Sequence, residues 1–409
     1  MSHSTLSHAV PTGRRRYRRL HWVLQRLLSR LVAGTLTLRL PDGTTLRGTG
    51  ARPGPAASIE LHRWRTVRRF LLGGDNGLAE AYMDADWSTP DLPALLEFGA
   101  LNQDAIGAGG GWRARLVRRL LHLASTNTRS GSRRNIRAHY DLGNAFYATW
   151  LDRSMTYSSA ISTAAAHALE EAQEQKLAYI VRLLALSGSE RVLEIGCGWG
   201  ALAERIAARG CHITGLTLSP AQRGHALARL QAAGLAERAE LRLQDYRDTS
   251  GRFDRIVSIE MLEAVGAEYW PAYFATLRDR MAAGGHAVLQ FISIAEDRFA
   301  AYRDGADFIQ RHIFPGGMLP SVAAMQSEAS RAGLVLETAL TFAAGYAATL
   351  AAWRRRFLAA WPVLREQGFD EAFRRKWEYY LAYCEAGFRT GILDVGLYVV
   401  RPETAESAG

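Results

Sequence analysis

RVLEIGCGWGALAER, residues 191–205, is a short apolar run that passes into a glycine-rich turn and then into the start of a helix. Val192, Leu193 and Ile195 are apolar or β-branched, which predicts a buried strand. A helix that begins at about Ala201 offers backbone N–H groups with no partner inside the helix. Glycines in between let the backbone approach a ligand without hindrance from Cβ atoms. They are Gly196, Gly198 and Gly200. The stretch therefore predicts a strand, a turn shaped for a ligand, and a helix.

The spacing of these glycines separates two classes of ligand. A dinucleotide-binding turn places its third glycine three positions after the second, which here is Ala201. The third glycine is Gly200 instead. ExGxGxG after a strand favours the turn that binds S-adenosylmethionine (SAM), in which Glu194 helps to order the loop and Trp199 lies within it. A strand-to-helix turn that binds no ligand is the alternative.

Strand and helix patterns alternate around this turn. Helices are expected over residues 170–186, 220–233 and 269–281, and strands over residues 212–218, 239–243, 254–259 and 287–294. Gly284 and Gly285 are expected to end the last of these helices and to separate it from the strand over residues 287–294. The alternation predicts an α/β fold with a doubly wound, mostly parallel, Rossmann-like sheet covered by helices on both faces.

Polar residues follow several of the expected strands, where ligand sites of such sheets lie. The candidates after three successive strands are Thr217 and Ser219, then Gln244, Asp245 and Tyr246, then Glu260 and Glu263. Gln290 lies within the following strand. Many SAM enzymes place an acid after the second strand to hold the ribose, and this chain has Thr217 and Ser219 there. Those hydroxyls, or Gln222 and its neighbours, are expected to take over part of that contact.

A small separate domain is predicted at the start of the chain. Residues 20–31 show helical spacing of leucines and a basic opposite side, which fits either a membrane-surface helix or an ordinary packed helix. A hairpin is expected over residues 34–50, and helices over residues 79–87 and 92–101. Residues 73–76 are expected to interrupt the segment that precedes the first of these helices. We therefore expect an α+β domain over residues 1–106, a basic flexible linker over 107–134, and a catalytic domain over 135–409.

Charge predicts an anionic partner. The 409-residue chain has a net charge of +10 and a pI near 9.8. Its arginines gather in two blocks: Arg14, Arg15, Arg16, Arg18 and Arg19, then Arg113, Arg115, Arg118 and Arg119 with Arg129, Arg133 and Arg134. Nucleic acid and anionic lipid are the two candidate partners. A general preference for arginine is the alternative, because the only lysines are Lys176 and Lys376.

Cysteine spacing and hydropathy bear on the compartment. Cys197, Cys211 and Cys384 show no metal-ligand or CxxC spacing, so we expect no metal site and a reduced, cytoplasmic setting. No apolar run approaches the roughly 18 residues that span a bilayer. We therefore expect a protein that works peripherally, at the inner face of the membrane.

Aromatic residues concentrate in residues 135–160, 350–361 and 377–388. They suit a pocket for a long apolar ligand. Additional core packing explains them equally well.

Residues 135–400 resemble the cyclopropane-fatty-acyl-phospholipid synthase family, which includes the mycolic acid cyclopropane synthases. The matching motifs, in order, are HYDLGNAFYATWLD, MTYSSA, VLEIGCGWG, TLSPAQ, LQDYRD, FDRIVSIEMLEAVG, IFPGGMLPS and YYLAYCEAGF. The resemblance implies a class I SAM-dependent methyltransferase that modifies the cis double bond of unsaturated acyl chains in membrane phospholipids. The partner is then an anionic phospholipid surface and no nucleic acid, since no nucleic-acid module is present. A homodimer is possible.

The same resemblance assigns site residues. The family's base is thought to be a bicarbonate held by a cysteine, a glutamate, a histidine and a tyrosine. The glutamate matches Glu263 and the tyrosine matches Tyr346, whereas the cysteine position is Ser159 and the histidine position is Gln290. Segments that line SAM match Tyr157 and Ser158, residues 192–200, residues 217–222, and Tyr246 with Arg247. Gln244 and Asp245 precede the last pair.

The altered bicarbonate site leaves the product open. A cyclopropane ring is one outcome, and a methylene or methyl-branched unsaturated chain is the other, because both follow from the same carbocation. A non-catalytic protein that binds lipid or SAM is an alternative of another class.

Overall fold

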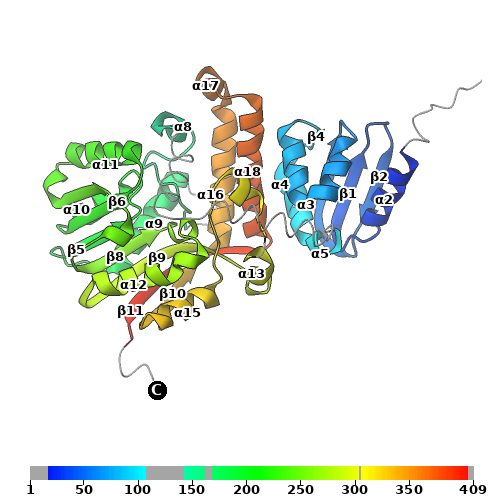
Figure 1. Ribbon diagram of the computed structural model, residues 1–409. Coiled ribbons are helices and arrows are strands. Elements are labelled where there is room, and N and C mark those ends of the chain that lie inside the picture. The colour runs from blue at the N-terminus through cyan, green and yellow to red at the C-terminus, as the bar shows by residue number, and fades with distance from the viewer. Residues whose placement is uncertain (1–16, 107–141, 162–167, 304, 404–409) are drawn as a thin grey trace, which may run out of the picture. The chain divides into compact units, whose positions relative to one another are not determined.

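The computed structural model describes residues 17–106, 142–161, 168–303 and 305–403 (Figure 1). It divides into two compact units, Met1–Gly110 and Gly111–Gly409. The expected linker over residues 107–134, with all of its arginines, lies outside the described residues, as do Arg14, Arg15 and Arg16. The domain boundaries at residues 106 and 134 therefore stay predictions.

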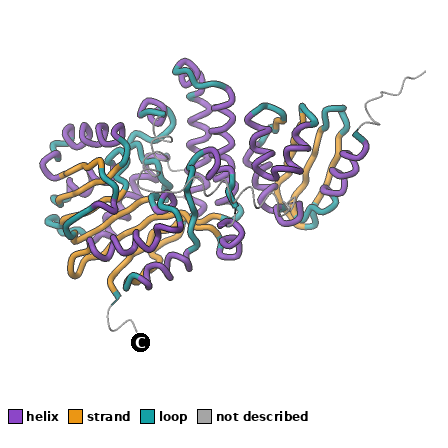
Figure 2. Tube along the Cα trace, in the orientation of Figure 1, coloured by secondary structure: helices purple, strands orange, loops and turns teal. Residues whose placement is uncertain are grey.

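The N-terminal unit contains a four-stranded sheet with the order β2-β1-β3-β4 (Figure 2). Its strands are β1 (Ala33–Arg39), β2 (Thr45–Thr49), β3 (Arg52–Leu61) and β4 (Trp87–Ser88). β1 and β2 form the expected antiparallel hairpin, and its turn includes Gly43 with φ +81°. β3 pairs in parallel with β1. A small α+β unit at this end of the chain is thus confirmed.

Helices of this unit are α2 (Arg18–Leu28), α3 (Arg65–Met83), α4 (Leu92–Leu101) and α5 (Gln103–Ile106). α4 has the predicted bounds, because the Asp91 side chain accepts a hydrogen bond from Ala94 N and caps it. The expected helix over residues 79–87 is wrong at its end. α3 stops at Met83, and Trp87 belongs to β4, where its Nε1 donates to Leu78 O at 2.9 Å. The glycines at 73–76 do not end α3, which continues through a kink at Gly74.

The larger unit contains a seven-stranded sheet with the order β10-β11-β9-β8-β5-β6-β7. Its strands are β5 (Arg191–Ile195), β6 (His212–Thr217), β7 (Ala239–Leu243), β8 (Phe253–Ile259), β9 (Met281–Ile294), β10 (Leu334–Thr341) and β11 (Leu393–Pro402). The strands from β5 to β9 pair in parallel, and β11 pairs antiparallel with both β9 and β10. The predicted α/β fold with a mostly parallel sheet is confirmed.

Helices flank this sheet (Figure 1). They are α8 (Asn144–Ala148), α9 (Leu169–Leu184), α10 (Ala201–Ala208), α11 (Pro220–Ala232), α12 (Trp270–Arg280), α13 (Glu296–Arg303), α14 (Phe308–His312), α15 (Val322–Arg331), α16 (Ala343–Ala359), α17 (Trp361–Glu366) and α18 (Glu371–Arg389). α16 and α18 lie side by side as a pair of long helices.

One break expected from the sequence is wrong. β9 begins at Met281 and continues through Gly284 and Gly285, instead of starting after them. Gly284 has φ +71°, and a Cβ at Gly285 would lie 2.9 Å from Asp254 O on the neighbouring strand. The glycines therefore make a close approach between β8 and β9 possible at an irregularity in their pairing.

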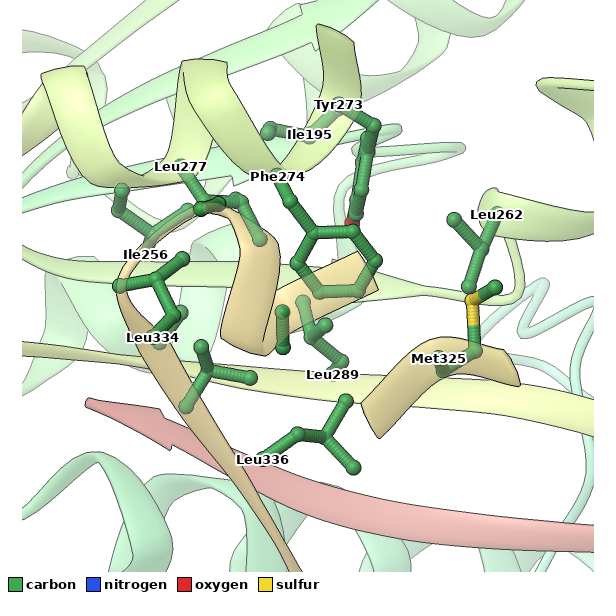
Figure 3. Packing of buried hydrophobic residues seen from close by; sticks show 14 of the residues in the cluster. Ile195, Ile256, Leu262, Tyr273, Phe274, Leu277, Leu289, Met325, Leu334 and Leu336 are labelled. Carbon is green, nitrogen blue, oxygen red and sulfur yellow. The ribbon is translucent and has the colours of Figure 1, made fainter. Parts of the chain in front are cut away.

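The hydrophobic core beneath α12 and α15 fixes the position of the central strands (Figure 3). Phe274 and Leu277 of α12 are fully buried, and they pack with Ile256 of β8 and Leu289 of β9. Met325 of α15 is buried in the same cluster. Strand ends that carry site residues are thereby held on a rigid base.

β5 is the point at which the order of the sheet reverses, because β6 lies on one side of it and β8 on the other. In doubly wound sheets, ligands bind at this point, outside the carboxyl ends of the strands. The glycine turn follows β5, and Glu260 follows β8. Both segments thus reach the expected crevice.

Candidate active site

The glycine turn has the backbone that its sequence predicts. Gly196, Gly198 and Gly200 have φ values of +88°, +50° and +84°, which side chains other than glycine rarely adopt. The backbone N–H groups of Gly196 and Cys197 donate to Leu216 O, at 3.0 and 2.8 Å, and tie the turn to β6. A Cβ at Gly200 would lie 2.8 Å from the Cβ of Ala226 on α11, whereas one at Gly198 would meet nothing within 4 Å. The turn is packed on one side and open at Gly198.

Glu194 is buried in β5 just before this turn. Its Oε2 has no hydrogen-bond partner among the described residues. Burial raises the pKa of this carboxyl to about 8. An unpartnered buried carboxylate is costly unless another group donates to it. The open side of Gly198 and the free oxygen of Glu194 together fit a ligand with hydrogen-bond donors, and SAM carries both hydroxyl and ammonium donors.

After β6, three polar residues hold one another. Thr217 Oγ1 donates to Gln222 Oε1 at 2.9 Å and accepts from Ser219 N at 3.1 Å. Ser219 caps α11, because its side chain accepts from Gln222 N. These are the residues expected to replace the ribose-binding acid. The structure brings them together as one buried cluster at the carboxyl end of β6.

After β7, Asp245 and Arg247 form a two-pronged ion pair. Arg247 Nε donates to Asp245 Oδ1 at 2.9 Å, and its NH2 donates to Oδ2 at 2.7 Å. The guanidinium lies over the rings of Tyr246 and Tyr269, at 5.6 and 5.2 Å. Tyr246 Oη is buried with no partner among the described residues. Gln244 donates to Asp248 O at 2.7 Å and closes the loop.

An aromatic wall lies beside the glycine turn. Trp199 Nε1 donates to Asn144 Oδ1 at 2.8 Å, and its ring lies 5.1 Å from that of Tyr147. Tyr157 lies 5.4 Å from Tyr147 and shares a hydrogen bond of 2.9 Å with Tyr380 Oη on α18. The wall joins the turn to the long helices. Asn144 lies within the motif HYDLGNAFYATWLD, although the motif alone gave it no separate role.

The catalytic candidates converge on a residue that the sequence analysis gave no catalytic role. Glu260 Oε1 accepts from Ser159 N at 2.8 Å and from Gln290 Nε2 at 2.7 Å. Its Oε2 accepts from Tyr346 Oη at 2.6 Å. Ser159 contributes its backbone, since its own Oγ donates to Ala160 O. The structure thus brings together Ser159, Gln290 and Tyr346 around a carboxylate.

Glu260 occupies an unusual backbone position at the end of β8. Its φ is +48°, which costs a residue other than glycine about 1 kcal/mol or more. Burial raises the pKa of its carboxyl, and the charge of Lys176 and the three donors oppose that rise. Lys176 of α9 is itself fully buried and donates to Ser158 Oγ at 2.5 Å. Burial lowers the pKa of Lys176 to about 8.

Glu263 lies apart from this set of donors. Its Oε1 accepts from Ile292 N at 2.6 Å, and its Oε2 is buried with no partner among the described residues. Burial raises the pKa of Glu263 to about 8, and the nearby charge of Glu260 adds to the rise. Within the described residues, no hydrogen bond joins Glu263 to Tyr346, Ser159 or Gln290. Its expected role as the glutamate of the anion site stays a prediction.

The residues expected to hold SAM stay a prediction, and the structure places them as follows. They are Tyr157, Ser158, Glu194, Gly196, Gly198, Trp199, Gly200, Thr217, Ser219, Gln222, Gln244, Asp245, Tyr246 and Arg247. They come from β5 and the glycine turn, from the segments that follow β6 and β7, including the first turn of α11, and from the segment at Tyr157 and Ser158. Within the described part of the chain, no group of three or more His, Cys, Asp or Glu is placed to hold a metal ion.

Comparisons with known proteins identify the family. Residues 127–397 match the family described as mycolic acid cyclopropane synthetase. A tuberculostearic acid methyltransferase of Mycobacterium tuberculosis is 40% identical over 385 residues, which cover 91% of this chain and 89% of that protein. A cyclopropane-fatty-acyl-phospholipid synthase of Escherichia coli is 36% identical over 346 residues, 81% of this chain and 85% of that protein.

A solved structure shows the same catalytic fold. A mycolic acid cyclopropane synthase complexed with SAH and CTAB has a TM-score of 0.60 and 29% sequence identity. It covers 66% of this chain and 97% of its own. The resemblance read from the motifs is confirmed, and SAM is the cofactor. The chain belongs to the mycolic acid cyclopropane synthetase family of SAM-dependent methyltransferases.

Proposed function

We propose that this enzyme methylates the double bond of an unsaturated acyl chain in a membrane phospholipid and releases an open-chain product, a methylene or methyl-branched unsaturated chain. The observation that carries the proposal is the cluster around Glu260. Its members match positions that hold bicarbonate in the resembling family, yet here they bind a carboxylate of the protein itself. The step that removes the proton is therefore rebuilt, whereas the glycine turn is complete.

The surroundings of Glu260 suit a reaction that passes through a carbocation. SAM supplies the electrophilic methyl group. The ring of Tyr346 lies 4.5 Å from that of Phe388 and 6.2 Å from that of Trp353, and Trp353 lies 5.3 Å from Tyr157. Aromatic faces stabilise positive charge, and a dry site prevents its capture by water. These four rings give the cation a stabilising wall.

The fate of one proton separates the two products. For a ring, the electron pair of a C–H bond in the added methyl group closes a new C–C bond. For an open chain, a C–H electron pair forms a C=C bond instead. Similarity to the tuberculostearic acid methyltransferase, over 91% of the chain, supports the open-chain outcome. Cyclopropane formation is the second candidate, favoured by the similarity to the Escherichia coli synthase and by the match of Tyr346.

Product analysis tests the proposal. The protein is expressed in a bacterium that lacks its own cyclopropane synthase. The fatty acid methyl esters are then separated by gas chromatography, and their masses are measured by mass spectrometry. We expect a one-carbon gain with the unsaturation retained, so that catalytic hydrogenation adds two hydrogens. A saturated ring as the sole product would select the second candidate. Bound SAM that is never consumed on unsaturated vesicles would favour the non-catalytic alternative.

An anionic membrane surface is the proposed source of substrate. Trp22 of α2 is 60% exposed, and the guanidinium of Arg26 lies 5.7 Å from its ring. Exposed indoles and arginines are typical of helices that lie at a charged lipid interface. Among the described residues, no helix is long and apolar enough to cross a bilayer. We therefore propose that the protein associates peripherally with the inner face of the membrane and that α2 makes contact with the lipid.

A further inference from the structure

We infer that Glu260 is the proton acceptor of the reaction and that its carboxylate takes the place of a separately bound anion. The inference rests on the proposed function, because it assigns one step of that reaction. It goes beyond it by naming the base, and it holds for an open-chain or a ring product.

The first support is the set of donors. Three groups from separate parts of the chain, Ser159 N, Gln290 Nε2 and Tyr346 Oη, all point at one carboxylate at 2.6–2.8 Å. A carboxylate and a bicarbonate present the same planar pair of oxygens to such donors. With Glu260 in place, Ser159 N and Tyr346 Oη have each used their single hydrogen and cannot donate to a second anion. Two adjacent negative charges would also repel each other.

The second support is the uneven use of the two oxygens. Each carboxylate oxygen has room for about two hydrogen bonds. Oε1 receives two, from Ser159 and Gln290, and Oε2 receives one, from Tyr346. One lone pair of Oε2 is therefore the site at which a proton can be taken up. The same oxygen is held next to the aromatic ring of Tyr346, which we place beside the cation.

The third support is the backbone. Glu260 has φ +48°, a conformation that glycine adopts without strain and a glutamate does not. It also follows β8 directly, where its N–H donates to Gln290 O at 2.8 Å. Strain of this kind persists when the surrounding structure fixes it, and it is typical of functional positions. Lys176, buried nearby, favours the charged form of the carboxylate, which is the form that accepts a proton.

The proton balance of the step is simple. A C–H bond of the cationic acyl chain breaks, and its electron pair forms the new C=C or C–C bond. The proton moves to Oε2 of Glu260, which becomes a neutral carboxylic acid. It returns to solvent after the product leaves, and no external oxidant, reductant or bicarbonate takes part.

The test uses full-length enzyme with SAM and vesicles of unsaturated phospholipid, in buffer freed of CO2 and in buffer with added bicarbonate. We expect wild-type turnover to be the same in both. Glu260→Gln should reduce turnover about 100-fold or more, the usual contribution of a general base, while the dissociation constant of SAM changes little. Glu260→Gly relieves the φ strain and so should fold. This variant leaves Ser159 N, Gln290 Nε2 and Tyr346 Oη without their carboxylate. Added formate or bicarbonate should therefore raise its turnover about tenfold.

Two controls sharpen the test. Glu263→Gln is the rival substitution, and we expect its loss of turnover to be about tenfold smaller than that of Glu260→Gln. Glu337→Gln, which removes a carboxylate from an exposed ion pair with Arg401, is the matched control, and we expect it to keep wild-type turnover. A wild type that needs bicarbonate, or a Glu260→Gln enzyme with more than about a tenth of normal turnover, would overturn the inference while the methyl transfer stood. A wild type that binds SAM but makes no product would overturn the proposed function, and the role of Glu260 with it.

Discussion

The substitution Glu194→Gln tests how the buried carboxyl of Glu194 changes the stability of SAM-free protein with pH. Glu194 is buried, its Oε2 has no partner among the described residues, and its pKa rises from 4.5 to about 8. In the unfolded chain this carboxyl loses its proton near pH 4.5, whereas in the folded protein it keeps it until about pH 8. Folding therefore gains from Glu194 at low pH and loses that gain as the pH rises.

The size of the effect follows from the difference between the two pKa values. A difference of about 3.5 corresponds to about 5 kcal/mol above pH 8, at about 1.4 kcal/mol per pH unit. Between pH 5 and pH 7.5, the wild type should lose about 3 kcal/mol of unfolding free energy that Glu194→Gln retains. Constant effects of the amide, such as an unsatisfied N–H group, shift the variant equally at every pH and cancel from this comparison.

The assay is urea unfolding of SAM-free protein followed by tryptophan fluorescence, at several pH values, for wild type and variant. Glu263, whose pKa is raised in the same way, titrates in both proteins and drops out of the difference. Calorimetry adds a second readout: if a donor of SAM reaches Glu194, binding at pH 7 should release a proton from the wild type and none from this position in the variant. Parallel stability curves for the two proteins would refute the reasoning.

Three further substitutions test other parts of the structure. Tyr346→Phe removes the donor to Glu260 Oε2 but keeps the ring, so turnover should fall about tenfold with unchanged SAM affinity; equal turnover would deny this hydroxyl a part in the step. Gly345→Ala places a Cβ 2.8 Å from Ala160 O, so it should cost about 1–3 kcal/mol by urea unfolding, whereas Gly224→Ala in α11, where a Cβ meets nothing within 4 Å, should stabilise by up to about 1 kcal/mol. Trp22→Ser should weaken sedimentation with anionic vesicles while leaving binding of SAM unchanged; sedimentation equal to that of wild type would exclude α2 from the membrane contact.

The sequence predicted the parts of the fold that depend on local patterns. The glycine turn and α4 were found because short-range signals fix them: three glycines at set spacing, and an aspartate cap before a proline. Gly284 and Gly74 misled for one reason. A glycine signals backbone freedom, but tertiary packing decides whether the chain then breaks, bends within a helix or passes through a strand.

The site shows where sequence patterns stop. Tyr346 and Gln290 were identified through motifs, but Glu260 was noted only as one of two acids after a strand. Its φ and its three donors arise from β8, β9, α16 and the segment before residue 160, which are far apart in the sequence. Lys176 was noted only as one of two lysines, although it is fully buried. Contacts of this range carry no local periodicity, so only the fold reveals them.

Ser159 and Gln290, at the family's cysteine and histidine positions, make physical sense together with Glu260 as a base. A bicarbonate that binds from solution must be held by strong donors, and a cationic imidazole would supply much of that attraction. A carboxylate on the chain needs no such attraction, because the backbone already positions it. An imidazolium beside Glu260 would lower the pKa of its carboxyl and make it a weaker base, whereas the neutral amide of Gln290 orients the carboxylate without that cost. If Glu260 is the base, as we infer, a glutamine at the histidine position is the residue that suits it.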